Sequence, residues 1–119
     1  MYEQKSFKKL VVWQKAYGLA QMIYKHSQNF PSAQSYGLTL QIRRAGVSVM
    51  ASIAEESERQ HKKEFLQFLS VARGSLAEVE TYLMFAKDLA HLNQKGFNSL
   101  EEQRQEVGRL LTGLYRSLS

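Results

Sequence analysis

The chain has 119 residues, of which 44% are hydrophobic and 23% are charged, which fits one globular domain spanning 1–119 with an ordered core at about 7–118. It has no cysteine, which excludes disulfides and cysteine–zinc sites. Residues 1–5 lack the apolar region of a signal peptide, and no apolar run approaches the roughly 18 residues of a membrane span. We therefore expect a cytoplasmic protein with no membrane contact.

The formal net charge is +5, and the basic excess lies in the first half of the chain. Residues 1–54 hold seven lysines and arginines against one acid, Glu3, whereas residues 55–119 hold nine against ten acids. A one-sided basic charge favours a polyanionic partner such as RNA. An ordinary surplus of surface lysine gives the same charge, so both interpretations stay open.

The first helix is predicted from Leu10 to about Asn29, where apolar residues form two neighbouring stripes at helical spacing. The first stripe is Val12, Ala16, Leu19 and Ile23, and the second is Trp13, Tyr17, Ala20 and Tyr24. The only proline, Pro31, disfavours helix at the residue before it. Residues 32–35 are therefore predicted as a loop.

The second helix is predicted from about Tyr36 to Glu58. Its apolar face consists of Leu38, Ile42, Ala45, Val49 and Ile53. Branched residues within 46–50 would also suit a strand, because they lose side-chain freedom in a helix. The period-four pattern on both sides of that segment favours the helix.

The third helix is predicted from Lys62 to about Leu92, with a turn at 93–96. Its apolar stripe is Phe65, Phe68, Leu69, Ala72, Leu76, Val79, Leu83, Ala86 and Ala90. The fourth helix is predicted to begin at the S-x-x-E capping box of 99–102, whose serine and glutamate satisfy free backbone N–H groups. Four helices joined by short connections predict an all-α, antiparallel up-down-up-down four-helix bundle.

No pattern for catalysis or metal binding stands out in the sequence. There is no G-x-S-x-G motif and no glycine-rich phosphate loop. Glu58 and His61 have the E-x-x-H spacing of di-iron bundles, but such sites need two copies of this motif, so a solvated turn is the favoured interpretation. We expect no enzyme activity, no metal and no cofactor.

Small residues recur at helical spacing along the third helix. They are Ser70, Gly74, Ala77 and Thr81. Such residues let another helix approach closely, and a helical glycine costs about 1 kcal/mol relative to alanine. Close packing inside the bundle explains the pattern, and so does an interface between subunits of a homo-oligomer; the sequence leaves both open.

Basic residues near three predicted helix starts are candidates for nucleic-acid binding. They are Lys8, Lys9 and Lys15 around the start of the first helix, Arg43 and Arg44 early in the second, and Lys62 and Lys63 at the start of the third. The first two helix starts lie at opposite ends of an antiparallel pair, so these groups need not form one patch. Aromatic and basic residues do not interleave along the sequence as they do in single-strand binders.

Two roles remain open for Arg43 and Arg44. Arginine suits phosphate because its planar fork donates two hydrogen bonds at once. The same geometry suits a carboxylate, so a structural salt bridge to Glu78 or Glu80 of the third helix is the alternative.

Six short segments in order carry a family resemblance over roughly Phe7 to Leu118. They are LVVWQKA at 10–16, YGLT and QIRRA at 36–39 and 41–45, IAE at 53–55, KKEF at 62–65, and GSLAE at 74–78. Together they resemble the four-helix-bundle proteins encoded within intervening sequences of bacterial 23S ribosomal RNA genes. The chain departs from the family pattern at 56–57, where the family has Gly-Tyr, and at His61, where it has a serine cap.

The resemblance implies a bundle that assembles into a ring, commonly a pentamer. Related bundles are accessory subunits of diversity-generating reverse transcriptases, in which a basic surface contacts the enzyme and nucleic acid. We therefore expect a non-enzymatic, oligomeric module that binds RNA or a nucleic-acid-handling partner such as a reverse transcriptase. A structural or protein–protein interaction scaffold with no nucleic-acid contact is the alternative.

Overall fold

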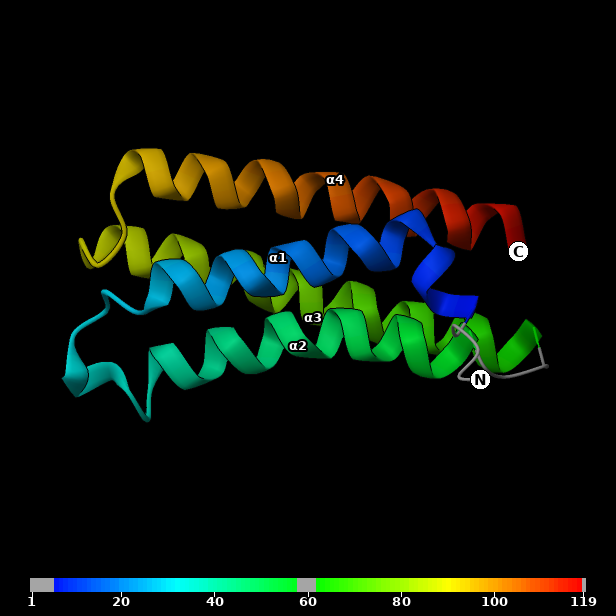
Figure 1. Ribbon diagram of the computed structural model, residues 1–119, viewed down its shortest axis with the longest axis horizontal. Coiled ribbons are helices and arrows are strands. Elements are labelled where there is room, and N and C mark those ends of the chain that lie inside the picture. Colours follow the sequence, from blue (N-terminus) through cyan, green and yellow to red (C-terminus); the bar gives the residue numbers. More distant parts are fainter. Residues whose placement is uncertain (1–5, 58–61, 119) are drawn as a thin grey trace, which may run out of the picture.

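Four long helices make up most of the chain in the computed structural model, which describes residues 6–57 and 62–118 (Figure 1). They are α1 (Val11–Ser27), α2 (Leu38–Ser57), α3 (Lys62–Asp88) and α4 (Gln94–Leu118), with short 3-10 turns η1 (Ser6–Lys9) and η2 (Ser32–Gln34). No strand occurs in the described residues, and the segment 46–50 is helical. Glu58 and His61 lie outside the described residues, as do the side chains at 56–57 and of Lys62.

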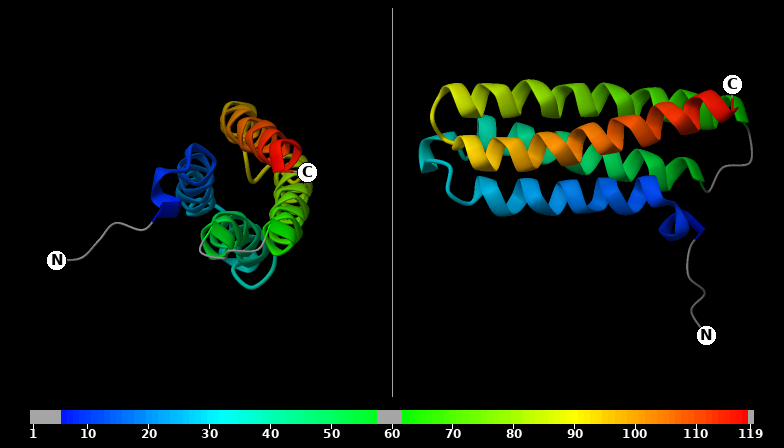
Figure 2. Two further views of the ribbon diagram at one scale, coloured as in Figure 1. Left: turned by 90° about the vertical axis from the view of Figure 1, so that its right-hand side faces the viewer. Right: turned by 90° about the horizontal axis from the view of Figure 1, so that it is seen from above.

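The helices pack into one bundle with alternating directions. In Figure 1, α1 and α3 run from right to left, and α2 and α4 run from left to right. The end-on view in Figure 2 places them in a ring, in which each helix packs on its neighbours in the chain and α4 closes against α1. The predicted all-α four-helix fold is confirmed.

The core lies where the apolar stripes of the four helices meet. The largest side chains with less than 2% exposure are Leu19, Ile23, Ile42, Ile53, Leu69, Leu83, Leu100, Leu111, Val49, Val79 and Val107. Each such side chain contributes roughly 1.5–3 kcal/mol relative to an exposed one. The first predicted stripe of α1 is buried throughout. Ala90, predicted in the apolar stripe of the third helix, is exposed.

The connection from α1 to α2 is longer than predicted. α1 ends at Ser27, whose Oγ donates to the Tyr24 carbonyl at 3.2 Å. The Phe30 N–H then donates to the Ser27 carbonyl at 3.1 Å, and the Phe30 side chain is buried, which turns the chain back towards the core ahead of Pro31. A 3-10 turn occupies the predicted loop, and α2 begins at Leu38 rather than at about Tyr36.

The end of α3 differs from the prediction that it continues to Leu92. Ala90 has a positive φ of 62°. The His91 N–H donates to the Ala86 carbonyl and the Ala90 N–H to the Lys87 carbonyl, both at 2.9 Å, which is the Schellman ending. Glycine usually occupies the positive-φ position, so alanine there gave no signal that the helix stops.

The start of α4 also differs, because the predicted capping box at Ser99 is wrong. Ser99 lies inside α4, which begins at Gln94. Asn93 is the cap instead, since its Oδ1 accepts the Gly96 N–H at 2.7 Å. Asparagine caps as well as serine does, and Asn93 follows directly on Leu92, which is buried in the core.

Candidate functional site

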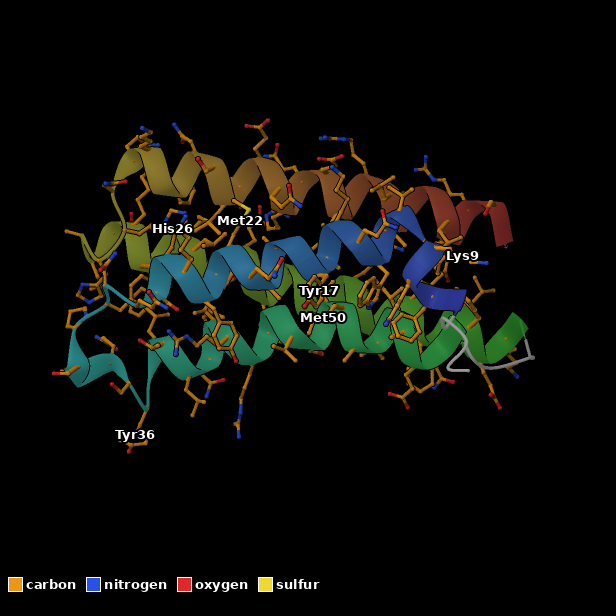
Figure 3. The ribbon with its side chains drawn as sticks, viewed as in Figure 1. Lys9, Tyr17, Met22, His26, Tyr36 and Met50 are labelled. Atoms are coloured by element: carbon orange, nitrogen blue, oxygen red, sulfur yellow. The ribbon has the colours of Figure 1, made fainter. Side chains whose placement is uncertain are left out.

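A groove follows the seam between α1 and α2. It consists of two adjoining hollows of about 470 and 450 Å³ that share Tyr24 and Val47. The first is also lined by Ser35, Thr39, Leu40, Arg43, Arg44 and Ser48, and the second by Tyr17, Ala20, Gln21, Lys25, Gln28 and Met50. Figure 3 shows Tyr17 of α1 next to Met50 of α2 at this seam. We term these residues the α1–α2 groove.

Arg43 is held against the last turn of α1. Its Nε donates to Ser27 Oγ at 2.8 Å, and a terminal nitrogen donates to the Tyr24 carbonyl at 3.4 Å. The guanidinium carbon lies 4.6 Å from the centroid of the Tyr24 ring, a cation–π contact. The carbonyls at the end of a helix carry partial negative charge, so Arg43 stabilises the end of α1.

The salt bridge considered between Arg43 and Glu78 or Glu80 is not formed: the partners of Arg43 are neutral groups. Glu80 pairs with Arg104 of α4, with 2.9 Å between nitrogen and oxygen. The hydrogen bonds of Arg43 go to α1 instead, which fixes its guanidinium at the wall of the groove.

Arg44 and Lys25 add positive charge to the same groove. Both side chains are exposed. Among the described residues that line the two hollows there is no carboxylate, and the sequence has no acid from Ser6 to Ala54. The described lining of the groove therefore contains cations and no acid.

Aromatic rings line this seam and meet basic residues in space, although the two kinds of residue do not interleave along the sequence. Phe7 meets Trp13 edge-on, and Trp13 stacks on Tyr17, with 5.0 Å between ring centroids in each pair. Tyr17 and Tyr24 are 42% and 44% exposed. The interleaving arises between two helices, with the tyrosines on α1 and the arginines on α2, so spacing along one segment did not reveal it.

Sequence reasoning missed Tyr17, Tyr24 and Lys25 as groove residues. The signals that point to them are the seven-residue spacing of the two tyrosines, which puts them on one face of a helix, and the absence of acids between Ser6 and Ala54.

Lys15 lies away from the groove. Its Nζ pairs with Glu106 of α4 at 3.4 Å, and both side chains are more than one-third exposed. Such a surface pair is worth about 0–1 kcal/mol. Lys15 therefore faces α4 and does not contribute to the charge of the α1–α2 groove.

Lys8, Lys9 and Lys63 lie at the other end of the bundle from the start of α2. Figure 3 shows Lys9 at one end and Tyr36, which precedes α2, at the opposite end. Lys63 is exposed in the first turn of α3, which begins at the same end as α1 (Figure 1). The predicted basic residues whose side chains are described thus fall into separate groups.

One face of α3 points away from the bundle and is rich in small and apolar residues. A Cβ added at Gly74 would meet no atom within 4 Å, so close packing inside the bundle does not explain this glycine. We define the outer α3 face as the exposed small residues Ser70, Gly74, Ala77 and Thr81 together with the exposed apolar residues Val71, Met84, Phe85 and Leu89.

Carboxylates of α3 and α4 are engaged in an ion-pair cluster around Arg104. Arg104 Nε donates to Glu101, and a terminal nitrogen donates to Glu80 and to Glu101, each at 2.9 Å. The Arg104 side chain is only 13% exposed. The hydrogen bond to Glu101 raises the pKa of Arg104 above its ordinary value, so the guanidinium stays charged. This cluster joins α3 to α4 and leaves its arginine no free face for a ligand.

Other candidate sites are weaker in the part of the chain that the structure describes. A third hollow, of about 380 Å³ between α1 and α4, has Arg109 as the one charged residue in its described lining. Among the residues that the structure describes, no group of three or more histidine, aspartate and glutamate side chains could hold a metal ion.

A helix that spans a membrane has to be both long and predominantly apolar. Within 6–57 and 62–118, no helix is both long and apolar enough to cross a bilayer.

Comparison with known proteins gives a family and a fold. Residues 8–113 match the family model described as 23S rRNA-intervening sequence protein. A crystal structure of a protein with unknown function from the S23 ribosomal protein family of Bacteroides thetaiotaomicron VPI-5482 is similar, with a TM-score of 0.81. The two chains are 21% identical, and the likeness covers 89% of this chain and 96% of that one, so it shows the fold alone. No curated protein sequence matches this chain.

Proposed function

The chain belongs to the family of 23S rRNA-intervening sequence proteins, and from this premise we propose that it is a non-enzymatic, oligomeric bundle that binds RNA through the α1–α2 groove. The observation that carries the proposal is the positive charge of Lys25, Arg43 and Arg44 in a groove whose described lining contains no carboxylate. A polyanion can neutralise these cations without displacing an internal acid.

Arg44 is the main phosphate contact in this proposal. Its side chain is exposed, whereas Arg43 is already engaged with the end of α1. The exposed Ser35 lines the same hollow, and its hydroxyl can form hydrogen bonds with a phosphate or a ribose. Because bound phosphates release condensed counterions, the affinity for RNA should fall as salt rises.

The experiment measures the binding of labelled RNA by fluorescence anisotropy over a range of salt concentrations. Arg44→Ala should weaken binding for all RNA sequences and lower the slope of log affinity against log salt by about one, with an unchanged melting temperature. Arg109→Ala, which removes an exposed arginine from α4, is the matched control and should change neither quantity. An unaltered RNA affinity in Arg44→Ala would count against the groove as the binding site.

The outer α3 face supports a second part of the proposal, in which copies of the chain associate. Gly74 is held in a helix at a cost of about 1 kcal/mol relative to alanine, although a Cβ at this position would meet no neighbouring atom within 4 Å. Val71, Met84 and Phe85 leave about half of their surface exposed on the same helix. A second copy of the chain packed on this face would explain both the glycine and the exposed apolar residues. In the alternative function, a protein–protein scaffold without RNA contact, the same face would bind the partner protein.

Sedimentation of the purified chain tests the association. The parent should sediment above monomer mass at tens of micromolar, roughly the range of weak interfaces. Gly74→Leu should shift it towards monomer by steric clash, whereas Gly113→Leu, at a glycine of α4 that is equally free of neighbours, should not. A parent that is monomeric under these conditions refutes the association.

A further inference from the structure

The α1–α2 groove combines two chemistries along one line. Its cations are Lys25, Arg43 and Arg44, and its described lining holds no acid. Its exposed rings are those of Tyr17 and Tyr24, both on α1. A phosphate backbone satisfies the cations, but it does not cover the exposed surface of the two rings.

Those rings are held in fixed positions before any ligand binds. Tyr24 has the guanidinium of Arg43 over its ring at 4.6 Å, and that guanidinium is itself held by Ser27 at 2.8 Å. Tyr17 stacks on Trp13 with 5.0 Å between ring centroids. Side chains that are already ordered lose less conformational entropy on binding, so these rings are suited to be stacking platforms.

The spacing of the rings fits consecutive bases. Tyr17 and Tyr24 are seven residues apart, so they lie on the same face of α1, about 10.5 Å apart along its axis at 1.5 Å per residue. Stacked bases on one strand are about 3.4 Å apart, so the two rings are separated by about three base steps. A strand of a few nucleotides therefore reaches both tyrosines.

A nucleic-acid duplex does not match the cations and exposed rings of the groove. Its bases are stacked and paired, and an A-form RNA helix presents phosphates, 2′-hydroxyls and base edges rather than free base faces. Unpaired bases can leave their stack and lie on aromatic or guanidinium planes, with the backbone tracking a basic groove.

We infer that the α1–α2 groove holds an unpaired nucleic-acid strand, with bases stacked on Tyr17 and Tyr24 and phosphates at Lys25 and Arg44. This inference rests on the proposed function and adds the class of nucleic acid that the groove selects. Arg43 is a positioning residue that fixes the ring of Tyr24.

Fluorescence anisotropy with two probes tests the inference, namely an oligouridylate of about ten nucleotides and an RNA duplex of the same length. The single strand should bind more tightly than the duplex. Tyr17→Leu and Tyr24→Leu should each weaken it by about fivefold to a hundredfold, the effect of losing one stacked base, whereas Tyr17→Phe should keep the parent affinity.

Tyr115→Leu is the matched control, because Tyr115 of α4 also has an arginine over its ring, Arg73, at 5.3 Å. It should leave RNA affinity unchanged, and a melting curve for each variant checks that it is folded. Equal affinity for duplex and single strand, with no effect of either tyrosine substitution, overturns the stacking inference and leaves the proposed function standing.

Two further results separate the inference from its premise. If polyglutamate of equal charge displaces the oligouridylate as well as unlabelled oligouridylate does, the groove accepts any polyanion and the inference fails. If the parent binds neither RNA probe at low salt, the proposed function fails with it.

Discussion

The α1–α2 layer and the α3–α4 layer of the bundle differ in the balance and the pairing of their charged side chains. From Ser6 to the end of α2 at Ser57 the chain has six lysines and arginines against two acids, Glu55 and Glu56, whereas α3 and α4 together have eight against seven acids. In α3–α4, Arg104 is closed into a cluster with Glu80 and Glu101. In α1–α2, Arg43 is held by neutral groups of α1, and Arg44 is exposed.

For the proposed function, the difference indicates that α3 and α4 use their charges for stability, whereas α1 and α2 present theirs for binding. Paired charges join helices and contribute to stability, while cations without nearby acids are available to an external anion. Both layers share one core, so a change in the core should affect the whole bundle, whereas changes to charged residues should separate stability from binding.

The largest effect is expected from Leu76→Ala in the shared core. Leu76 is 5% exposed, and its truncation should lower the free energy of unfolding by about 2–5 kcal/mol because it removes buried surface and leaves a cavity. Urea unfolding followed by circular dichroism measures this. Leu89→Ala, at a leucine that is 40% exposed, is the control and should cost far less; a Leu76→Ala variant as stable as the parent contradicts the packing of the bundle.

Arg104→Ala should come next, with a loss of about 2 kcal/mol. It leaves Glu101 and Glu80 without their partner in a partly covered site, and the low exposure of Arg104 limits screening by water. The same variant should bind RNA like the parent. A loss of RNA affinity without a loss of stability would reverse the roles assigned to the two layers.

Arg43→Ala and Arg44→Ala sharpen the comparison within a single turn of α2. Arg43→Ala should lower stability by about 1 kcal/mol, because it removes the hydrogen bond to Ser27 and the cation–π contact with Tyr24. Arg44→Ala should change stability by less than about 0.5 kcal/mol. Thermal unfolding of the two variants side by side checks this, and equal destabilisation would show that Arg44 also has a structural role.

The smallest effect is expected at the turn between α3 and α4. Ala90 has a φ of 62°, where an L-residue is strained and glycine is not. Ala90→Gly should therefore raise the free energy of unfolding by about 0.5–1 kcal/mol and leave RNA affinity unchanged. Urea titration of this variant checks the sign, and a destabilised variant would contradict the Schellman geometry.

The sequence was sufficient for the helices and their buried faces, because periodic apolar residues such as Leu19 and Ile42 report directly on burial. It misplaced the turn between α3 and α4, where an alanine occupies a position that glycine usually fills and where α4 is capped by Asn93, ahead of the predicted cap Ser99.

The groove was harder to predict because it depends on the relative rotation of two helices. Arg43 contacts Ser27 and Tyr24, which are 16 and 19 residues away in the chain. No local spacing in the sequence encodes those contacts. For the small residues of α3, the sequence showed a stripe but did not show whether it faces the core or the outside of the bundle. The exposed Gly74 follows from the placement of the buried stripe on the opposite side of the helix.

The most direct test of the account maps where RNA touches the protein. Backbone amide chemical shifts of the isotope-labelled chain are recorded as an oligouridylate of about ten nucleotides is added. The account predicts that the shifted amides fall within residues 17–28 and 35–50, which border the α1–α2 groove. Shifts concentrated on α3 and α4, or the absence of any shift at low salt, would contradict it.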